Sequence, residues 1–202
     1  MDKKKVGLYS LLILFLALVS YFYVDIVVAH YFNQIKGPIK TLFSQYITKL
    51  GKSEWILILS IALYFIYRTK KPSLAQKGLF VFASIALSGI LVNVLKVIFS
   101  RYRPKAYFND NLFGFDLFGF QTEYIYNSFP SGHSVTAMGL AIAMTLLIPK
   151  HKIWFLLFGV IVASSRFIIT AHYVSDVLVG GLIGGLVSYY LYTQYFKSKI
   201  SI

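Results

Sequence analysis

The chain has 202 residues, of which 57% are hydrophobic and only 13% are charged, and its mean hydropathy is +0.68. This composition excludes an ordinary soluble domain and indicates a polytopic membrane protein. The chain has no cysteine, which excludes a disulfide framework, a thiol nucleophile and a cysteine metal site. The net charge of +13 is scattered over the ends of apolar runs, so we attribute it to membrane topology and anionic headgroups and expect no nucleic-acid partner.

Uncharged apolar runs divide the chain into six segments, at 6–24, 55–67, 78–95, 134–149, 153–165 and 177–196. A membrane-spanning helix needs about 20 residues. The runs 55–67 and 153–165 hold only 13 residues each, so they are either re-entrant segments or full spans whose end turns carry polar groups. We favour full spans, because Arg68 can snorkel, Trp55 suits an interfacial belt, and the fifth run can continue past Arg166. The sequence therefore predicts an all-α membrane protein with six transmembrane helices in a single domain, residues 1–202.

The segments around the first apolar run need separate interpretation. The opening MDKKK imitates a secretory signal, but no small-x-small cleavage site follows the run, so we expect a retained first helix. Between the first two runs, apolar side chains recur at three- and four-residue spacing, which predicts a short amphipathic helix on the membrane surface. These side chains are Ile39, Leu42, Phe43, Tyr46 and Ile47.

The positions of lysine and arginine near the helix ends predict the orientation. Six spans place both termini on one side, and that side carries slightly more basic residues than the other. By the positive-inside rule, we expect both termini in the cytoplasm. The segments that follow the third and fifth runs then face outward.

A first polar cluster ends the third run, in the segment KVIFSRYRP from Lys96 to Pro104. Lys96 and Arg103 are seven residues apart, so on an α-helix they would lie almost above one another. Pro104 predicts that the helix ends near Arg103. Two cations would then point the same way at a helix end, either toward an anion or merely toward lipid headgroups.

A second cluster, SFPSGHS from Ser128 to Ser134, precedes the fourth run. Ser128 is a possible N-cap, Pro130 suits a first helical turn, and Gly132 allows a close approach of the backbone. Backbone N–H groups at a helix N-terminus form an anion site, and His133 would stand beside it. An ordinary helix cap with an interfacial histidine is the alternative.

A third cluster, SRFIITAHYVSD at 165–176, places charge where the chain otherwise reads as membrane. His172 and Asp176 are four apart, hence neighbours on one helical face, and a carboxylate bonded to an imidazole fixes its tautomer. Arg166 adds planar donors that suit a phosphate. The alternatives are an interhelical polar contact and a snorkelling arginine. Since the topology puts all three clusters outside, together they predict a phosphate site with a nucleophile and an acid.

The three clusters also resemble a known signature. Their patterns are Lys96-x6-Arg103-Pro104, then Pro130-Ser131-Gly132-His133, then Ser165-Arg166-x5-His172-x3-Asp176. Their order and spacing resemble the three-part signature of the type 2 phosphatidic acid phosphatase superfamily, with no departure at any signature position. The chain looks like the small bacterial branch that hydrolyses lipid phosphates outside the cytoplasmic (inner) membrane.

The resemblance implies a role for each of these residues. His172 would attack phosphorus to give a phosphohistidine, Asp176 would hold His172 in the productive tautomer, and His133 would protonate the leaving oxygen and then activate water. The groups expected to bind the phosphate oxygens are Lys96, Arg103, Ser131, the N–H of Gly132, and Arg166. Three cations can stand where other enzymes use magnesium, so we expect no metal and no other cofactor.

The physiological substrate is left open by the sequence. Phosphatidylglycerophosphate, undecaprenyl pyrophosphate, phosphatidic acid and lipid A phosphates are all candidates within the family. The aromatic loop 105–127 either steers a lipid headgroup into the site or only anchors itself at the interface. Three other functions are alternatives: a phosphotransferase that passes the phosphoryl group to a lipid or sugar, a vanadium haloperoxidase, and a non-catalytic transporter or channel. The spans and lipid-facing loop argue against the haloperoxidase, and the two histidines with an aspartate argue against the transporter.

Overall fold

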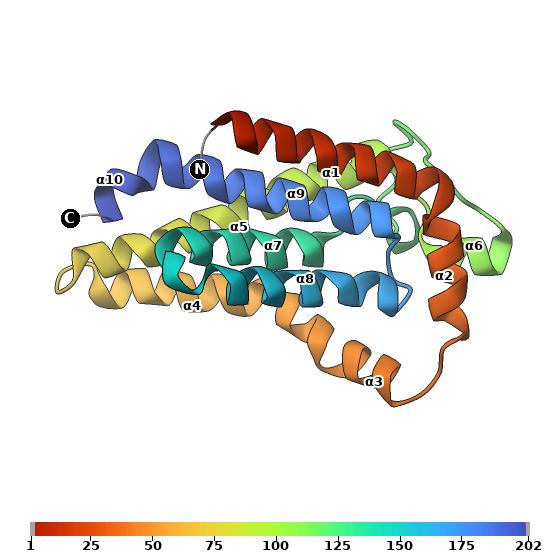
Figure 1. Cartoon of the computed structure of the whole chain (residues 1–202), viewed down its shortest axis with the longest axis horizontal. Coiled ribbons are helices and arrows are strands. Elements are labelled where there is room, and N and C mark those ends of the chain that lie inside the picture. Colours follow the sequence, from red (N-terminus) through yellow and green to blue (C-terminus); the bar gives the residue numbers. More distant parts are fainter. Residues whose placement is uncertain (1–2, 201–202) are drawn as a thin grey trace.

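The computed structural model describes residues 3–200 and is a bundle of helices (Figure 1). Within that range the chain forms no β-strand, as expected for long apolar runs whose backbone must satisfy its own hydrogen bonds in a bilayer. The α-helices are α1 (Lys3–Tyr23), α2 (Asp25–Gln34), α3 (Pro38–Gln45), α4 (Ser53–Tyr67), α5 (Pro72–Phe99), α6 (Pro104–Asp110), α7 (Gly132–Leu147), α8 (Lys152–Ile168), α9 (Val174–Leu191) and α10 (Lys197–Ile200). Short turns of 3₁₀-helix, including η1 (Ile47–Gly51), and one π-turn (Tyr192–Phe196) connect or extend them.

Five stretches of residues 3–200 are long and apolar enough to cross a membrane: Lys3–Tyr23, Pro38–Tyr67, Pro72–Phe99, Pro149–Ile168 and Val174–Ile200. They indicate an integral membrane protein. Helix α7 is also apolar but has only 16 residues, a rise of about 24 Å against a hydrocarbon core of about 30 Å. The count of six spans, which includes α7, therefore stays a prediction.

The two short apolar runs and the segment after the first run all form helices. Both runs form helices longer than their uncharged residues, because α4 starts at Ser53 and α8 continues past Arg166 to Ile168. The short helix expected after the first run is present as α3, which has no buried residue. Its place on the membrane surface stays a prediction.

Helices α7 and α9 pack closely enough to bring their first turns together. A Cβ atom at Gly184 would lie 2.1 Å from the carbonyl oxygen of Val135, and one at Gly180 would lie 2.6 Å from that of Ser131. Only glycine permits such a close backbone approach between membrane helices. The Ser131 N–H donates to the Asp176 carbonyl oxygen over 3.1 Å. The second and third polar clusters are thereby held against each other.

One end of the bundle carries all three polar clusters, and we call it the site end. There α5 and α8 end, α7 and α9 begin, and α2 and α6 lie across the bundle (right side of Figure 1). Helix α1 starts and α10 ends toward the opposite end. An apolar core fills that opposite half, and its buried members are Phe80, Val81, Ile85, Ala143, Leu191 and Phe196.

Two expected helix ends were wrong. Helix α5 ends at Phe99, because Ser100 adopts a left-handed conformation (φ 40°) and the chain turns back to bond with the loop 114–118. Arg103 therefore lies outside that helix, in extended backbone before α6, and not above Lys96 on one helix. Likewise α7 starts at Gly132 with Ser131 as its N-cap, so Ser128 is not a cap. The Ser128 hydroxyl instead donates to the Asp176 carboxylate over 2.6 Å.

Candidate active site

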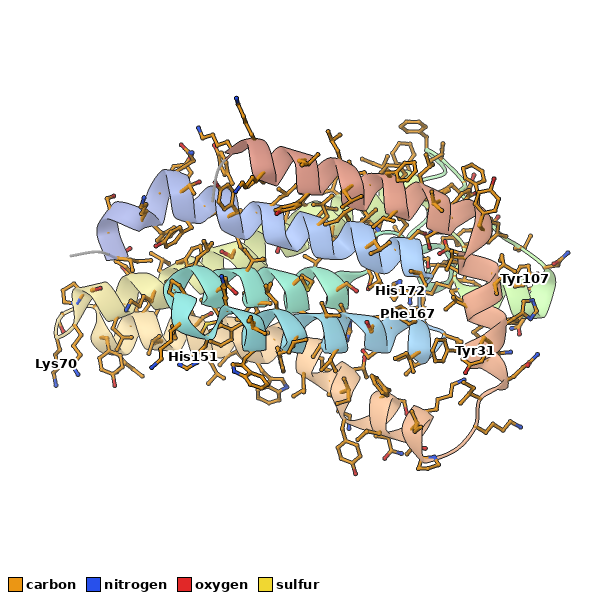
Figure 2. The ribbon with its side chains drawn as sticks, in the orientation of Figure 1. Tyr31, Lys70, Tyr107, His151, Phe167 and His172 are labelled. Carbon is orange, nitrogen blue, oxygen red and sulfur yellow. The ribbon has the colours of Figure 1, made fainter. Side chains whose placement is uncertain are left out.

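His172 lies in the turn between α8 and α9, at the site end (Figure 2). It is 3% exposed. Its Nδ1 is 2.7 Å from the Ser128 carbonyl oxygen, which can only accept, so Nδ1 carries the hydrogen. Its Nε2 then has a lone pair, 3.2 Å from Nη1 of Arg103. Burial lowers the pKa of His172 to about 3, although the nearby Asp176 carboxylate acts in the opposite direction. The imidazole is therefore neutral at pH 7, with an unprotonated nitrogen facing a cation.

Asp176 acts on His172 by charge at short range and not through the expected hydrogen bond. Its nearest oxygen is 3.7 Å from Nδ1 of His172, because His172 precedes the helix and the two do not share a helical face. The carboxylate accepts from the Ser128 hydroxyl at 2.6 Å and from the Tyr173 N–H at 2.9 Å. The tautomer is thus fixed by the Ser128 carbonyl, and the prediction that Asp176 fixes it directly was wrong.

Arg103 and Lys96 converge although they lie on different elements. Nη2 of Arg103 and Nζ of Lys96 both donate to the Asn127 carbonyl oxygen, over 2.9 and 3.2 Å. Arg103 also donates to the carbonyl oxygens of Tyr124 (2.8 Å) and Ala171 (2.9 Å), and its guanidinium lies 3.8 Å from the centre of the Tyr124 ring. Burial lowers the pKa of Arg103, but an arginine still stays charged at neutral pH. Carbonyl groups fix these two cations in place without neutralising them.

Arg166, in the last turn of α8, is the third cation. It is 8% exposed, and its Nη1 donates to the hydroxyl of Thr48 in η1. Its Nε is buried and has no hydrogen-bond partner within residues 3–200. In the same part of the chain, none of the three cations forms an ion pair with an acid. Two buried arginines and a half-buried lysine without acidic partners suit a bound anion.

His133 stands in the first turn of α7 and borders a cavity of about 410 Å³ between α4, α5 and α7. Lys96 and Gly132 line the same cavity. A Cβ atom at Gly132 would meet nothing within 4 Å, so its backbone faces open space. Ser131 is fully buried, and its hydroxyl oxygen accepts from Ser134 over 2.9 Å. The first N–H groups of a helix lack intrahelical partners, so this turn offers donors beside a histidine and a cation.

Sequence reasoning missed Thr48, Arg101 and Asp25, which complete this arrangement, and assigned the wrong role to Ser128. Ser128 and Thr48 hold His172 and Arg166, as described above. Arg101 is fully buried and pairs with both Asp25 and Asp176, over 2.8 and 2.5 Å. One signal could have found Asp25, because the chain has only 7 acidic residues against 20 lysines and arginines. An acid at the end of an apolar run in such a chain calls for a cationic partner.

The charged side chains of the site are mostly hydrogen-bond donors, which suit an anion. Within residues 3–200 no group of three or more histidine, aspartate or glutamate side chains could hold a metal. Asp176 is already bonded by an arginine, a hydroxyl and a backbone N–H.

Taken together, fold and site define a helical membrane protein in which cationic side chains without acidic partners lie near a neutral, buried histidine. Residues 77–200 match the PAP2 superfamily, and the chain belongs to this family. The resemblance inferred from the three sequence patterns is thereby confirmed.

Two curated relatives act on lipid A. The lipid A 1-phosphatase of Rhizobium etli is 32% identical over 151 residues, which is 69% of this chain but only 64% of that protein. The lipid A 4'-phosphatase of Porphyromonas gingivalis is 26% identical over 180 residues, which covers 83% of this chain and 71% of that protein.

A solved structure extends the likeness over nearly the whole chain. The transmembrane PAP2-type phosphatidylglycerolphosphate phosphatase of Bacillus subtilis superposes with a TM-score of 0.63, covering 97% of this chain and 96% of that one. At 23% identity this similarity concerns the fold alone.

Proposed function

We propose that this protein is a metal-independent lipid phosphatase that acts through a phosphohistidine on His172. One observation carries the proposal: Nε2 of a neutral, buried His172 lies 3.2 Å from Arg103, in a site with three cations. Residues 3–200 contain no group of three or more histidine, aspartate or glutamate side chains that could hold a metal ion. Phosphoryl transfer depends mostly on positioning and charge stabilisation, and these residues supply both.

In the first step, Nε2 of His172 attacks phosphorus and the bond from phosphorus to the lipid oxygen breaks. Lys96, Arg103 and Arg166 bind the non-bridging oxygens, helped by Ser131 and the N–H of Gly132. His133 enters this step as imidazolium, gives its proton to the leaving oxygen and becomes neutral. The phosphorylated imidazole keeps its Nδ1–H bond to the Ser128 carbonyl oxygen and gains a positive charge, which Asp176 stabilises from 3.7 Å.

In the second step, His133 takes a proton from water, and the resulting hydroxide attacks phosphorus. The phosphorus–Nε2 bond breaks, inorganic phosphate forms, and His172 returns to its neutral state. Because the leaving oxygen must reach His133, the lipid part of the substrate lies in the cavity that His133 borders. The other wall of that cavity includes apolar residues of α4 and α5, among them Leu57 and Ile90.

The substrate class is a lipid phosphate monoester or diphosphate. The lipid A phosphatases among the relatives favour lipid A phosphates, while phosphatidylglycerophosphate, undecaprenyl pyrophosphate and phosphatidic acid remain candidates. The single domain, the six spans, the outward-facing site in the inner membrane and the cytoplasmic termini belong to the same proposal. Cysteines placed at Asn111 and Ser73 test the orientation, because an impermeant thiol reagent should label only Asn111→Cys in intact cells.

Phosphate release by the purified protein from a panel of these lipid phosphates tests the activity. We expect release that persists in excess EDTA and is inhibited by vanadate, which can adopt the geometry of the phosphoryl group in transfer. Loss of activity in EDTA with recovery in magnesium would disprove the metal-free reaction. Phosphate that appears only on an added lipid or sugar, and never free, would instead indicate a phosphotransferase.

A further inference from the structure

Arg101 is the centre of a closed ionic cluster next to the site. Its side chain is fully buried, Nη1 donates to Asp176 over 2.5 Å and Nη2 donates to Asp25 over 2.8 Å. Four aromatic rings surround the guanidinium, with centres 4.5 to 5.6 Å away: Tyr21, Phe113, Phe115 and Tyr173. Burial alone would lower the pKa of Arg101, but the two carboxylates outweigh it and raise the pKa. The cluster therefore holds one positive and two negative charges away from water.

The net charge of this cluster determines how strongly it stabilises a positive charge on His172. Asp176 paired with Arg101 alone would be a neutral pair, and a neutral pair stabilises a positive imidazole only weakly. In a poorly polarisable interior the field of a nearby charge is strong, so the balance matters. Asp25 supplies a second negative charge to the far side of Arg101 and leaves the three groups with a net charge of −1. The surplus charge lies next to the histidine that would become positive when phosphorylated.

Asp25 is buried, and hydrogen bonds fix both of its carboxylate oxygens. It is 1% exposed and is the first residue of α2. Oδ1 accepts from the Ser20 hydroxyl at 2.8 Å and from the Ser175 N–H at 3.0 Å, while Oδ2 accepts from Arg101 and from the Ser175 hydroxyl at 2.5 Å. Asp25 precedes residues 77–200, which match the family. A residue of the N-terminal segment is thus bonded to the first turn of α9, one residue from Asp176.

We propose that Asp25 is a positioning residue for the phosphoryl transfer: it offsets the charge of Arg101, so that Arg101 can fix the Asp176 carboxylate without cancelling its negative charge beside His172. The proposal rests on the proposed function, since it concerns the charge that the phosphohistidine step creates.

The first test is Asp25→Asn, which keeps the shape and removes the charge. We expect kcat for release of phosphate from a lipid phosphate to fall roughly 10- to 100-fold, as for other residues that orient a reacting group, with KM within about twofold. The phosphoenzyme should form more slowly by a similar factor. Asp110→Asn is the matched control, because Asp110 is an exposed acid on α6 at the same end of the bundle, and it should behave as wild type. An Asp25→Asn protein with wild-type kcat overturns the proposal.

A second test distinguishes charge compensation from a merely structural role. It still gives a result if one of the single variants fails to fold. Arg101→Gln removes the charge that Asp25 offsets while keeping two N–H donors. In that background Asp25→Asn should cost no further kcat per folded molecule, and the double variant should be at least as active as Asp25→Asn alone. The double variant is compared with whichever single variant folds. An equal loss from Asp25→Asn in both backgrounds shows that Asp25 acts independently of Arg101 and overturns the proposal. Wild-type protein that releases no phosphate from any lipid phosphate would instead refute the proposed function itself.

Discussion

Two arginines separated by one residue illustrate two kinds of charged region at the site end. Arg103 belongs to an open group with Lys96 and Arg166, held by carbonyl oxygens and hydroxyls and bordered by cavities. Arg101 belongs to a closed group with Asp25 and Asp176, fully buried and enclosed by aromatic rings. A cation without an acid is available to a ligand, whereas a cation with two acids is part of the framework. Under the proposed function, the open group binds the phosphate, whereas the closed group supplies negative charge beside His172.

The largest expected effects test which histidine is the nucleophile at the boundary of these regions. His172→Ala should lower turnover by at least about a thousandfold and abolish the phosphoenzyme with every substrate. His133→Ala removes the acid, which a good leaving group hardly needs, so with p-nitrophenyl phosphate it should still form some phosphoenzyme but release it slowly.

Trapping of acid-labile, base-stable phosphoprotein from labelled substrate measures both variants. Asp176→Asn should trap an amount of phosphoprotein between those of His172→Ala and His133→Ala, because the Ser128 carbonyl oxygen still fixes the imidazole tautomer. Label trapped in His172→Ala but never in His133→Ala would reverse the two roles.

The same substitution at the two arginines tests the comparison directly. Arg101→Met leaves two carboxylates buried without their cation and should reduce the free energy of unfolding by about 3–5 kcal/mol. Arg103→Met leaves behind no acid, only carbonyl oxygens, the Tyr124 hydroxyl and Nε2 of His172. It should therefore unfold nearer to wild type but lose about 10- to 100-fold in kcat/KM through lost charge-assisted bonds to phosphate. Thermal unfolding in detergent and steady-state kinetics measure the two quantities. An equal loss of stability in both variants would contradict the distinction between a framework arginine and a ligand-binding arginine.

These two regions also differ in how far the sequence predicts them. Spacing and residue type identified the open group, because Lys96, Arg103 and Arg166 lie within local patterns that suit a phosphate. The closed group was not predicted, since Asp25 and Arg101 lie 76 positions apart in the sequence and no local pattern joins them. The same limit explains the wrong helix ends: Pro104 suggested a helix up to Arg103, but hydrogen bonds to the loop 114–118 end it at Phe99. Apolar runs predicted the helices well because each run is a property of its own segment.

The pH dependence of stability tests the charge state of His172, which lies between the two regions and faces Asp176, Arg103 and Arg166. The pKa of His172 is about 3 in the folded protein, below its usual value of about 6.5, so the unfolded chain binds the proton more tightly. Stability is therefore complete above about pH 6.5 and is lost as the pH falls toward 3, by about 2 kcal/mol at pH 5.

His172→Gln has no such proton to bind and serves as the reference. Between pH 7.5 and 5 the unfolding midpoint should fall about 4–8 °C further in wild type than in His172→Gln. All other titrating groups are common to the two proteins, so the difference isolates His172. Parallel curves would show that His172 is not held neutral.

The smallest expected effect concerns the cavity that extends from the open region into the bundle. Gly89 lines the cavity that holds His133 and Lys96, and a Cβ atom there would meet nothing within 4 Å. A second cavity of about 450 Å³ lies between α1, α7, α8 and α9; it is almost wholly apolar, and Gly185 lines it with its Cβ position 3.4 Å from Ile142. If the lipid part of the substrate lies beside His133, only the first cavity should matter for turnover.

Leucine at each glycine tests this difference with one matched pair of variants. Gly89→Leu should raise KM for a long-chain lipid phosphate about tenfold, which corresponds to about 1.4 kcal/mol of lost binding, and leave KM for a short-chain soluble phosphate unchanged. Gly185→Leu should change neither value, although it adds the same side chain to a cavity of similar size. The short-chain substrate reports on the phosphate site itself, so a loss with both substrates would mean that leucine disturbs the site and not the lipid cavity. A rise in KM for the long-chain substrate in Gly185→Leu alone would place the lipid chain on the other side of α7, away from the proposed acid, and would require a different group to protonate the leaving oxygen.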